Sequence, residues 1–409
     1  MLAVDVINKK RLGKELSYKE LDFIFNGYLE GSVKDYQMAA LLMAICINGM
    51  TDEEIYALTK IFIDSGDILD FGDEFGVIVD KHSTGGIGDK TTMVIGPIVA
   101  SCGVTVVKMS GRGLGYTGGT IDKFESIPGF KVNLSDEKIL RQIKKIGLVS
   151  SAQTANLTPL DKVVYALRDV TGTVSSVPLI ASSIMSKKIA AGADKILIDI
   201  KVGKGALIAT KEEAKHLSDL MIRIGEFYQR EVRCVISDMN TPLGYAIGNS
   251  LEVLEAIDVL KGKEYDNPFV DLCIELATDM VSMGKNISKR DAKLQVLDSL
   301  NKGHAYQKFL ELVKEQGGDL EKMVVSEKRQ KIKADRDGVI KKIDALECGK
   351  LSVTLGAGRR NKEDKIDHGV GIKLHKLVGE AVKKGDVLAT LYVNEKVDKK
   401  EYENIFEIK

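Results

Sequence analysis

The stretch KHSTGGIGD, residues 81–89, follows the short apolar run Val77–Val79 and leads into a helical pattern. A second stretch, SGRGLGYTGGT at residues 110–120, follows the apolar run Val104–Val107 in the same way. Strand, glycine-rich turn and helix in this order are typical of a parallel α/β sheet. Glycines let the backbone approach an anion closely, and the helix start behind the turn adds unpaired N–H groups and a positive dipole end. The two turns together predict a site for an oxyanion, of which phosphate is the best candidate.

Neither turn has the spacing of a nucleotide-binding loop. The first lacks the Gly-Lys-Ser/Thr ending of an NTPase loop. In the second, Tyr116 stands where a dinucleotide fingerprint needs its third glycine. The patterns therefore argue against an NTPase and against a nicotinamide-dependent oxidoreductase.

The composition excludes several broad classes of protein. The chain has 409 residues, and its 59 basic and 59 acidic side chains balance, so no net field attracts nucleic acid or an anionic membrane. Its five cysteines form no Cys-x-x-Cys pair, so neither a disulfide framework nor a zinc site is predicted. The start of the chain lacks the apolar block of a signal peptide, and no run reaches membrane-spanning length. We expect a soluble cytoplasmic protein.

The first region, residues 1–66, has the pattern of helices. Ser17–Glu20 and Thr51–Glu54 are capping boxes, in which a hydroxyl and a carboxylate satisfy opposing N–H groups at a helix start. Between them, Tyr36–Ile47 is nearly all apolar, which predicts a helix that packs on both sides, in the core or at a subunit contact.

The second region, residues 77–330, alternates short β-branched runs with helical patterns. It predicts an α/β domain, in which ligands bind beyond the carboxyl ends of the strands. The predicted strands are Val77–Val79, Val104–Val107, Ile196–Ile200 and Val232–Ile236. The predicted helices include Ser135–Ile146 and Thr210–Tyr228.

The third region, residues 331–409, has short strands and frequent glycines. Residues 379–389 are similar to the hairpin of a lipoyl or biotinyl barrel, but no modifiable lysine stands at a hairpin tip, so we interpret the region as a structural module. The predicted fold class is α/β with a separate all-helical domain. Residues 1–66, joined in space by about 160–192, form the helical domain, residues 77–330 a mixed or parallel-sheet domain, and residues 331–409 an α+β barrel-like module.

A third motif completes the functional pattern. Residues 182–188, SSIMSKK, together with the two glycine-rich turns and Asp122 and Glu125, resemble the pyrimidine-nucleoside phosphorylase family, which includes thymidine phosphorylase. The resemblance covers essentially the whole chain. It implies a glycosyltransferase of pentosyl groups that cleaves uridine, thymidine and deoxyuridine with phosphate to the base and (deoxy)ribose 1-phosphate. It also implies a homodimer, with no nucleic-acid or membrane partner and no organic cofactor.

The phosphate candidates come from both turns and their surroundings. Phosphorolysis needs a held nucleophile, tolerance of an oxocarbenium-like sugar and a stabilised leaving base, and positioning with fixed charge supplies most of that catalysis. Cations and hydroxyls for the phosphate are available at Lys81, Ser83, Thr92, Lys108, Ser110 and Thr120. The resemblance implies the same six, joined by the backbone near His82 and Met109.

The leaving pyrimidine needs positive charge near its ring oxygens. Ser183 and Lys187 are four apart in a predicted helix, which puts both on one face. The resemblance implies that Arg168, Ser183 and Lys187 bind the base. His82 has a pKa range suited to protonating the base, although a pyrimidine anion also leaves with charge support alone.

Two residues depart from the family pattern. Tyr116 stands where relatives have a histidine, and a phenol does not titrate near neutrality, which makes a proton shuttle there doubtful. The resemblance also implies a potassium ion held by Gly88, position 90, Leu243, Ala246 and Glu255. Position 90 is Lys90 rather than a threonine, so either its backbone carbonyl binds the ion or its ammonium replaces it.

Other functions stay open from the sequence. Lys108 in Val107–Ser110 favours the broad pyrimidine enzyme over a strictly thymidine-specific one. An anthranilate-type phosphoribosyltransferase would need an acidic magnesium pair, for which Asp194 and Asp199 make a weak case. A non-catalytic anion-binding or carrier protein built on the C-terminal module is the alternative outside enzymes.

Overall fold

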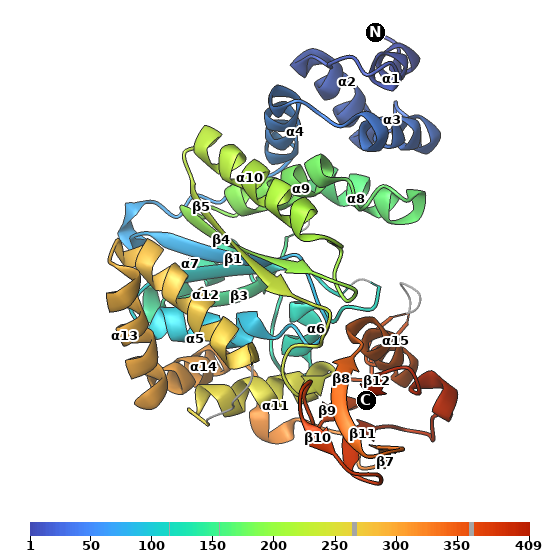
Figure 1. Cartoon of the computed structure of the whole chain (residues 1–409). Coiled ribbons are helices and arrows are strands. Elements are labelled where there is room, and N and C mark those ends of the chain that lie inside the picture. The colour runs from blue at the N-terminus through green and yellow to red at the C-terminus, as the bar shows by residue number, and fades with distance from the viewer. Residues whose placement is uncertain (114, 155, 264–267, 360–363) are drawn as a thin grey trace. The chain divides into compact units, whose positions relative to one another are not determined.

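The computed structural model describes residues 1–113, 115–154, 156–263, 268–359 and 364–409 (Figure 1). The chain divides into two compact units, each built from several segments. The first unit consists of Met1–Glu74, Thr154–Ile196 and Lys211–Cys234. The second consists of Phe75–Gln153, Leu197–Thr210 and Val235–Lys409.

The first unit is helical. Its helices are α1 (Ala3–Arg11), α2 (Tyr18–Leu29), α3 (Asp35–Asn48), α4 (Asp52–Asp64), α8 (Pro159–Thr171), α9 (Val177–Ala190) and α10 (Lys211–Phe227). Both predicted capping boxes are confirmed, because Ser17 and Thr51 accept from the backbone N–H groups of Glu20 and Glu54 while those carboxylates accept in return. The helices therefore begin where side chains satisfy their unpaired N–H groups.

The core of the first unit joins helices that are far apart in sequence. Phe25 of α2, Leu41 of α3, Phe62 of α4 and Leu160 of α8 belong to one buried cluster. α3 is apolar from Met38 to Ile47, but it buries only one side.

The centre of the α/β part is a five-stranded sheet. Its strands are β1 (Ile78–Ser83), β2 (Thr105–Ser110), β3 (Leu148–Ala152), β4 (Lys195–Val202) and β5 (Glu231–Asp238), in the order β3-β2-β1-β4-β5. β1 pairs in parallel with β2, and β2 pairs in parallel with β3, which confirms the predicted parallel sheet. The prediction missed β3, and it ended β1 too early. Since β1 runs to Ser83 and β2 to Ser110, both glycine-rich turns leave the same edge of the sheet.

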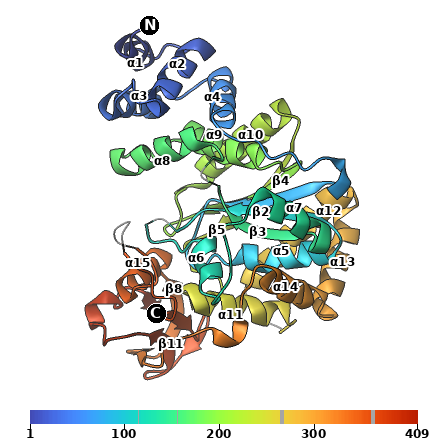
Figure 2. The ribbon, with the colours of Figure 1, turned by 180° about the vertical axis from the view of Figure 1, so that it is seen from behind.

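Some helices of the second unit pack against the sheet, and the others pack on those helices. They are α5 (Thr91–Ser101), α6 (Thr120–Glu125), α7 (Asp136–Ile146), α11 (Asn249–Leu260), α12 (Pro268–Lys285), α13 (Lys289–Asn301) and α14 (His304–Glu315), with short 3-10 turns at Asp73–Phe75, Leu320–Lys322 and Lys399–Glu401. Figure 2 shows α5 and α14 beside β2 and β3, and the core here is built from buried aliphatic side chains such as Val94, Ile98 and Leu312.

The C-terminal region adds two small antiparallel sheets. Its elements are β7 (Arg329–Lys333), β8 (Gly338–Ile343), α15 (Ala345–Leu355), β9 (Gly371–Leu374), β10 (Ala381–Val382), β11 (Val387–Tyr392) and β12 (Phe406–Ile408). One sheet has the order β10-β8-β12 and the other the order β6-β9-β11-β7, so the predicted barrel-like closure is not confirmed. β6 (Ala246–Ile247) lies between β5 and α11 in the chain, yet it pairs with β9 of the C-terminal region. One C-terminal sheet therefore includes β6, the short strand that precedes α11.

No helix among the described residues is long and apolar enough to cross a membrane.

Candidate active site

Lys81 lies at the carboxyl end of β1 with its side chain almost fully buried. Its Nζ donates to Thr91 Oγ1 at 2.6 Å and lies 3.3 Å from Asp199 Oδ2. Asp199, in β4, also contacts Lys201 at 2.6 Å. Lys81 and Lys201 thus share the Asp199 carboxylate, and this contact fixes the position of the Lys81 ammonium within the second unit.

The first glycine-rich turn is closed by Asp89. Ser83 Oγ and Thr91 Oγ1 donate to its two carboxylate oxygens at 2.5 and 2.6 Å, and Ser83 Oγ accepts from the Gly85 N–H. Burial alone would raise the pKa of Asp89, but the ammonium groups of Lys81, Lys201 and Lys123 and the Ser83 hydrogen bond hold it well below its usual range. The turn therefore contains a carboxylate that is ionised at neutral pH.

The second turn starts from Lys108 and Ser110 at the end of β2. Lys108 Nζ donates to the Met109 carbonyl at 2.9 Å and lies 3.7 Å from Asp80 Oδ1. The hydroxyl of Ser110 is buried, and it has no hydrogen-bond partner among the described residues. A buried hydroxyl without a partner is costly, and a bound ligand that accepts its hydrogen removes that cost.

Asp122 holds the far side of this turn. It accepts from the Gly113 N–H at 2.7 Å and pairs with Arg359 at 3.0 Å. A Cβ at Gly119 would lie 2.0 Å from the Gly113 nitrogen, so the turn requires glycine there. Close backbone packing of this kind leaves N–H groups, rather than side chains, along the turn.

The candidate phosphate residues converge in part. Lys81, Thr92 and Lys108 border one small void together with Ser150, which is paired in register with Lys108, although most of the lining is apolar, as at Ile95 and Phe124. Thr120 begins α6, Met109 is buried in β2, and His82 is half-buried next to Lys81. Tyr116 is exposed.

Carboxylates lie next to the candidate phosphate lysines, and the sequence analysis did not predict these pairs. Asp80 faces Lys108, and Asp89 and Asp199 lie near Lys81. Glu252 pairs in the same way with Lys123 of α6, at 2.7 Å. Asp199 carried a usable signal, since an acidic residue inside the apolar run Ile196–Ile200 needs a buried partner.

The candidate base residues lie in the first unit. Lys187 Nζ donates to Ser183 Oγ at 2.7 Å and to the Ser183 carbonyl at 3.1 Å, both within α9. It also forms an ion pair with Asp161 of α8, whose side chain is fully buried. The Tyr165 ring lies 5.9 Å from this ammonium. Asp161 and Tyr165 were not singled out by the sequence.

Arg168 is buried beside this pair. Its Nε, Nη1 and Nη2 donate to the carbonyls of Thr173, Leu179 and Val174 at 3.3, 3.2 and 2.8 Å. Burial lowers the pKa of Arg168, while Asp161 and Tyr165 raise it. These bonds use three of the five guanidinium N–H donors and fix the guanidinium against the turn between α8 and α9 and the start of α9.

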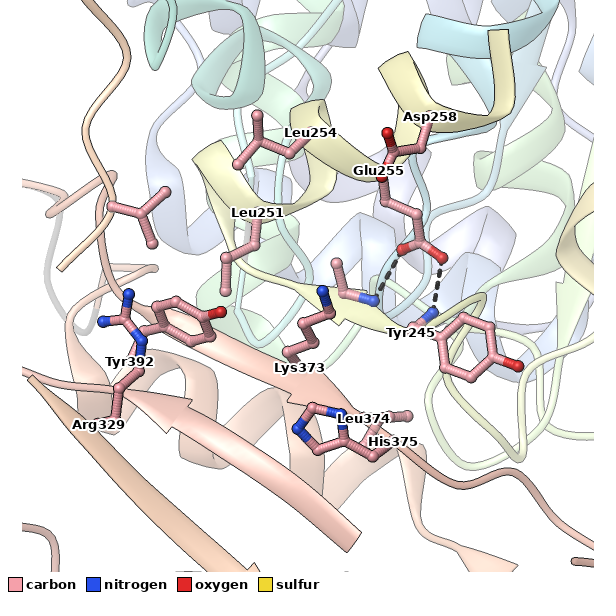
Figure 3. A pocket seen from close by; sticks show the side chains of 12 residues that line it. Tyr245, Leu251, Leu254, Glu255, Asp258, Arg329, Lys373, Leu374, His375 and Tyr392 are labelled. Carbon is pink, nitrogen blue, oxygen red and sulfur yellow. Dashed lines mark hydrogen bonds between the residues drawn. The ribbon is translucent and has the colours of Figure 1, made fainter. Parts of the chain in front are cut away.

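The candidate potassium ligands also come together, in the second unit. The Lys90 ammonium lies among the carbonyls of Gly88, Leu243 and Ala246 and pairs with Glu255 at 2.9 Å. Glu255 also borders a cavity of about 580 Å³ whose lining includes Tyr245, Lys373 and Tyr392 (Figure 3). Of the predicted site residues, this cavity contains Ala246 and Glu255.

The chain is similar to known proteins in sequence and in structure. Residues 76–306 match the α/β domain of a glycosyl transferase family, residues 4–66 its helical bundle domain, and residues 339–407 the C-terminal domain of pyrimidine nucleoside phosphorylase. The chain is 49% identical to the pyrimidine-nucleoside phosphorylases of Geobacillus stearothermophilus and of Bacillus subtilis, in each case over 99% of this chain and 96% of the relative. It is 48% identical to that of Staphylococcus epidermidis over 97% of this chain and 93% of the relative.

A solved structure with the same fold is anthranilate phosphoribosyltransferase from Thermus thermophilus. It has a TM-score of 0.61 and 19% sequence identity, and the match covers 76% of this chain and 99% of that one. At this identity the likeness establishes the helical and α/β architecture alone.

Proposed function

Because this chain belongs to the family of pyrimidine-nucleoside phosphorylases, we propose that it cleaves pyrimidine nucleosides with inorganic phosphate. The products are the base and a pentose 1-phosphate, so the enzyme transfers a pentosyl group. The observation that carries the proposal is the buried Ser110 hydroxyl, which has no hydrogen-bond partner in the described part of the chain and lies at the sheet edge near Lys81 and Lys108.

Phosphate binds at the two glycine-rich turns in this proposal. Lys81, Ser83, Lys108, Ser110 and Thr120 hold it, with Thr92 and the backbone near His82 and Met109. The ammonium groups of Lys81 and Lys108 keep their carboxylate partners when phosphate binds. Because their positions are already fixed, they orient the anion without any rearrangement of the site. Close positioning of the nucleophile is itself a large part of the rate gain.

The pyrimidine binds at Arg168, Ser183 and Lys187. As a phosphate oxygen bonds to C1′ of the sugar, the bond from C1′ to the base nitrogen breaks and its electron pair stays on the base. Lys187 and the two unused N–H donors of Arg168 stabilise that negative charge, and Asp161 keeps Lys187 in place. His82 is the candidate acid that protonates the departing base.

The substrates in this proposal are uridine, thymidine and deoxyuridine. The alternative is an enzyme restricted to thymidine and deoxyuridine, which Lys108 disfavours. Ultraviolet monitoring of purified protein is expected to show loss of uridine and of thymidine only when phosphate is present, without added magnesium. Intact uridine beside cleaved thymidine would favour the restricted enzyme, and a magnesium requirement would favour a phosphoribosyltransferase. No turnover of any nucleoside would contradict the proposal.

We further propose that the protein is a homodimer formed through the first unit. Tyr36, Met43 and Ile47 of α3 expose 74%, 40% and 75% of their surface, and Val170 of α8 exposes 79%. Apolar side chains gathered on neighbouring helices are typical of a protein interface. Light scattering is expected to give twice the chain mass for the parent and the single-chain mass for Ile47→Asp/Val170→Asp. A monomeric parent would contradict the dimer.

A further inference from the structure

The Lys90 ammonium lies inside a cage of oxygen atoms. Its Nζ donates to the carbonyls of Gly88, Leu243 and Ala246 at 2.9, 2.7 and 3.1 Å, and it lies 2.9 Å from Glu255 Oε2. The side chain of Lys90 is fully buried. The Phe269 ring, 4.6 Å from the Nζ at its centroid, closes another side. The contacts are those of a desolvated monovalent cation that has exchanged water for protein oxygens.

The cage is fixed by groups other than Lys90. The two carboxylate oxygens of Glu255 accept from the backbone N–H groups of Tyr245 and Ala246 at 2.7 Å each (Figure 3). Gly88 has a φ of +73°, and a Cβ there would lie 2.7 Å from the Leu243 carbonyl. A Cβ at Gly244 would lie 2.4 Å from Glu255 Oε1. The backbone is thus arranged to aim oxygens at one point, as in sites for hard cations.

A lysine at position 90 is unfavourable unless neighbouring groups stabilise its buried positive charge. It is the residue before α5, where the positive end of the helix dipole repels a cation. The carboxylate of Glu255 and the three carbonyls offset that repulsion. While Lys90 is present, the cage has no room for a potassium ion, because the ion would occupy the point already taken by the Nζ and meet a like charge there.

We propose that Lys90 is a built-in cation that replaces the potassium ion implied by the family resemblance. It ties the first glycine-rich turn, through Gly88, to the loop before α11, through Leu243 and Ala246. An ammonium group and a potassium ion carry the same charge and have similar size, so the cage accepts either. Because the lysine is part of the chain, this enzyme keeps its turn in place without any monovalent metal.

The test compares thermal unfolding of the full chain in potassium, sodium and tetramethylammonium chloride at equal ionic strength. The parent is expected to have the same Tm in all three salts. Lys90→Thr removes the ammonium and supplies a hydroxyl, and in tetramethylammonium chloride its Tm is expected to fall by about 5–10 °C, because Glu255 loses its buried partner. Potassium is expected to raise the Tm of this variant saturably, since it binds the folded state alone.

Lys123→Thr is the matched control. Lys123 is also buried and pairs with a buried carboxylate, Glu252, at 2.7 Å. Its variant is expected to lose stability equally in all three salts. Activity is measured in parallel, and the ratio of rates in potassium and sodium is expected to be about 1 for the parent and well above 1 for Lys90→Thr.

A saturable rise of the parent Tm in potassium, but not in sodium or tetramethylammonium, would overturn the proposal. So would a folded Lys90→Thr variant that potassium does not stabilise. If that variant does not fold, Lys90→Met/Glu255→Gln removes both charges, and its Tm is expected to be independent of potassium. Since the readout is unfolding, a failure here is separate from a failure of the proposed phosphorolysis.

Discussion

Replacing Lys187 by alanine is expected to lower kcat/KM for uridine phosphorolysis by about 10²–10³-fold, the usual effect of removing one fixed group that stabilises developing charge. Lys187 is held by Ser183 and by the buried carboxylate of Asp161, so its charge is in place before the base departs. The loss should fall mainly on kcat, because the negative charge on the pyrimidine grows as its bond to the sugar breaks. Steady-state kinetics at saturating phosphate measures this effect.

Stability has to be separated from catalysis in this experiment. Lys187→Ala leaves Asp161 without its ammonium, which costs on the order of 3–5 kcal/mol for a buried pair. Asp161→Asn/Lys187→Met removes both charges and is expected to unfold near the parent Tm while turnover stays low. Lys162→Ala, at an exposed lysine of α8 next to Asp161, is the charge-matched control and is expected to keep full activity. Full turnover by folded Lys187→Ala would remove Lys187 from the mechanism.

Ser110→Ala is expected to raise the KM for phosphate about 10- to 100-fold, since a hydrogen bond to a charged ligand is worth roughly 1.5–3 kcal/mol. The hydroxyl has no partner among the described residues, so its removal breaks no internal bond and the Tm should not fall. The KM for uridine should change much less than that for phosphate.

Ser126→Ala is the control for Ser110→Ala. Ser126 is also buried in the second unit, but its hydroxyl donates to the Lys123 carbonyl at 2.7 Å. That variant is expected to lose a little stability and to bind phosphate normally. An unchanged KM for phosphate in folded Ser110→Ala would contradict a phosphate site at the second turn.

Short-range patterns predicted the elements whose signals lie within a few residues. The capping boxes at Ser17 and Thr51 and the strands that precede the glycine-rich turns are of this kind. β3 was missed because Leu148–Ala152 contains two serines and only a short apolar run. Its pairing with β2, rather than its own propensity, makes it a strand.

Helix α15 was missed for a different reason. Gly349 lies inside it and suggests a break, but the glycine is there for packing, since a Cβ would lie 2.5 Å from Ile87 Cδ1 and 3.0 Å from Tyr116 Cβ. A glycine can therefore mark close approach rather than a helix end. One sequence does not distinguish the two cases.

The site was predictable to the extent that its partners are close in sequence. The spacing of Ser183 and Lys187 correctly put both on one face of α9. The carboxylates that pair with the lysines, such as Asp199 for Lys81 and Asp161 for Lys187, come from other elements. Only the fold brings them together, so a local pattern can mark a carboxylate as buried, as at Asp199, without identifying its partner.

The pairing of β6 with β9 changes what the last eighty residues mean for the enzyme. Ala246 in β6 offers its carbonyl to Lys90, and the same strand is hydrogen-bonded to Lys373 and Ile372 of β9. The C-terminal region therefore supports the strand whose carbonyl accepts from Lys90, and truncation of the region is expected to loosen the contacts around that ammonium.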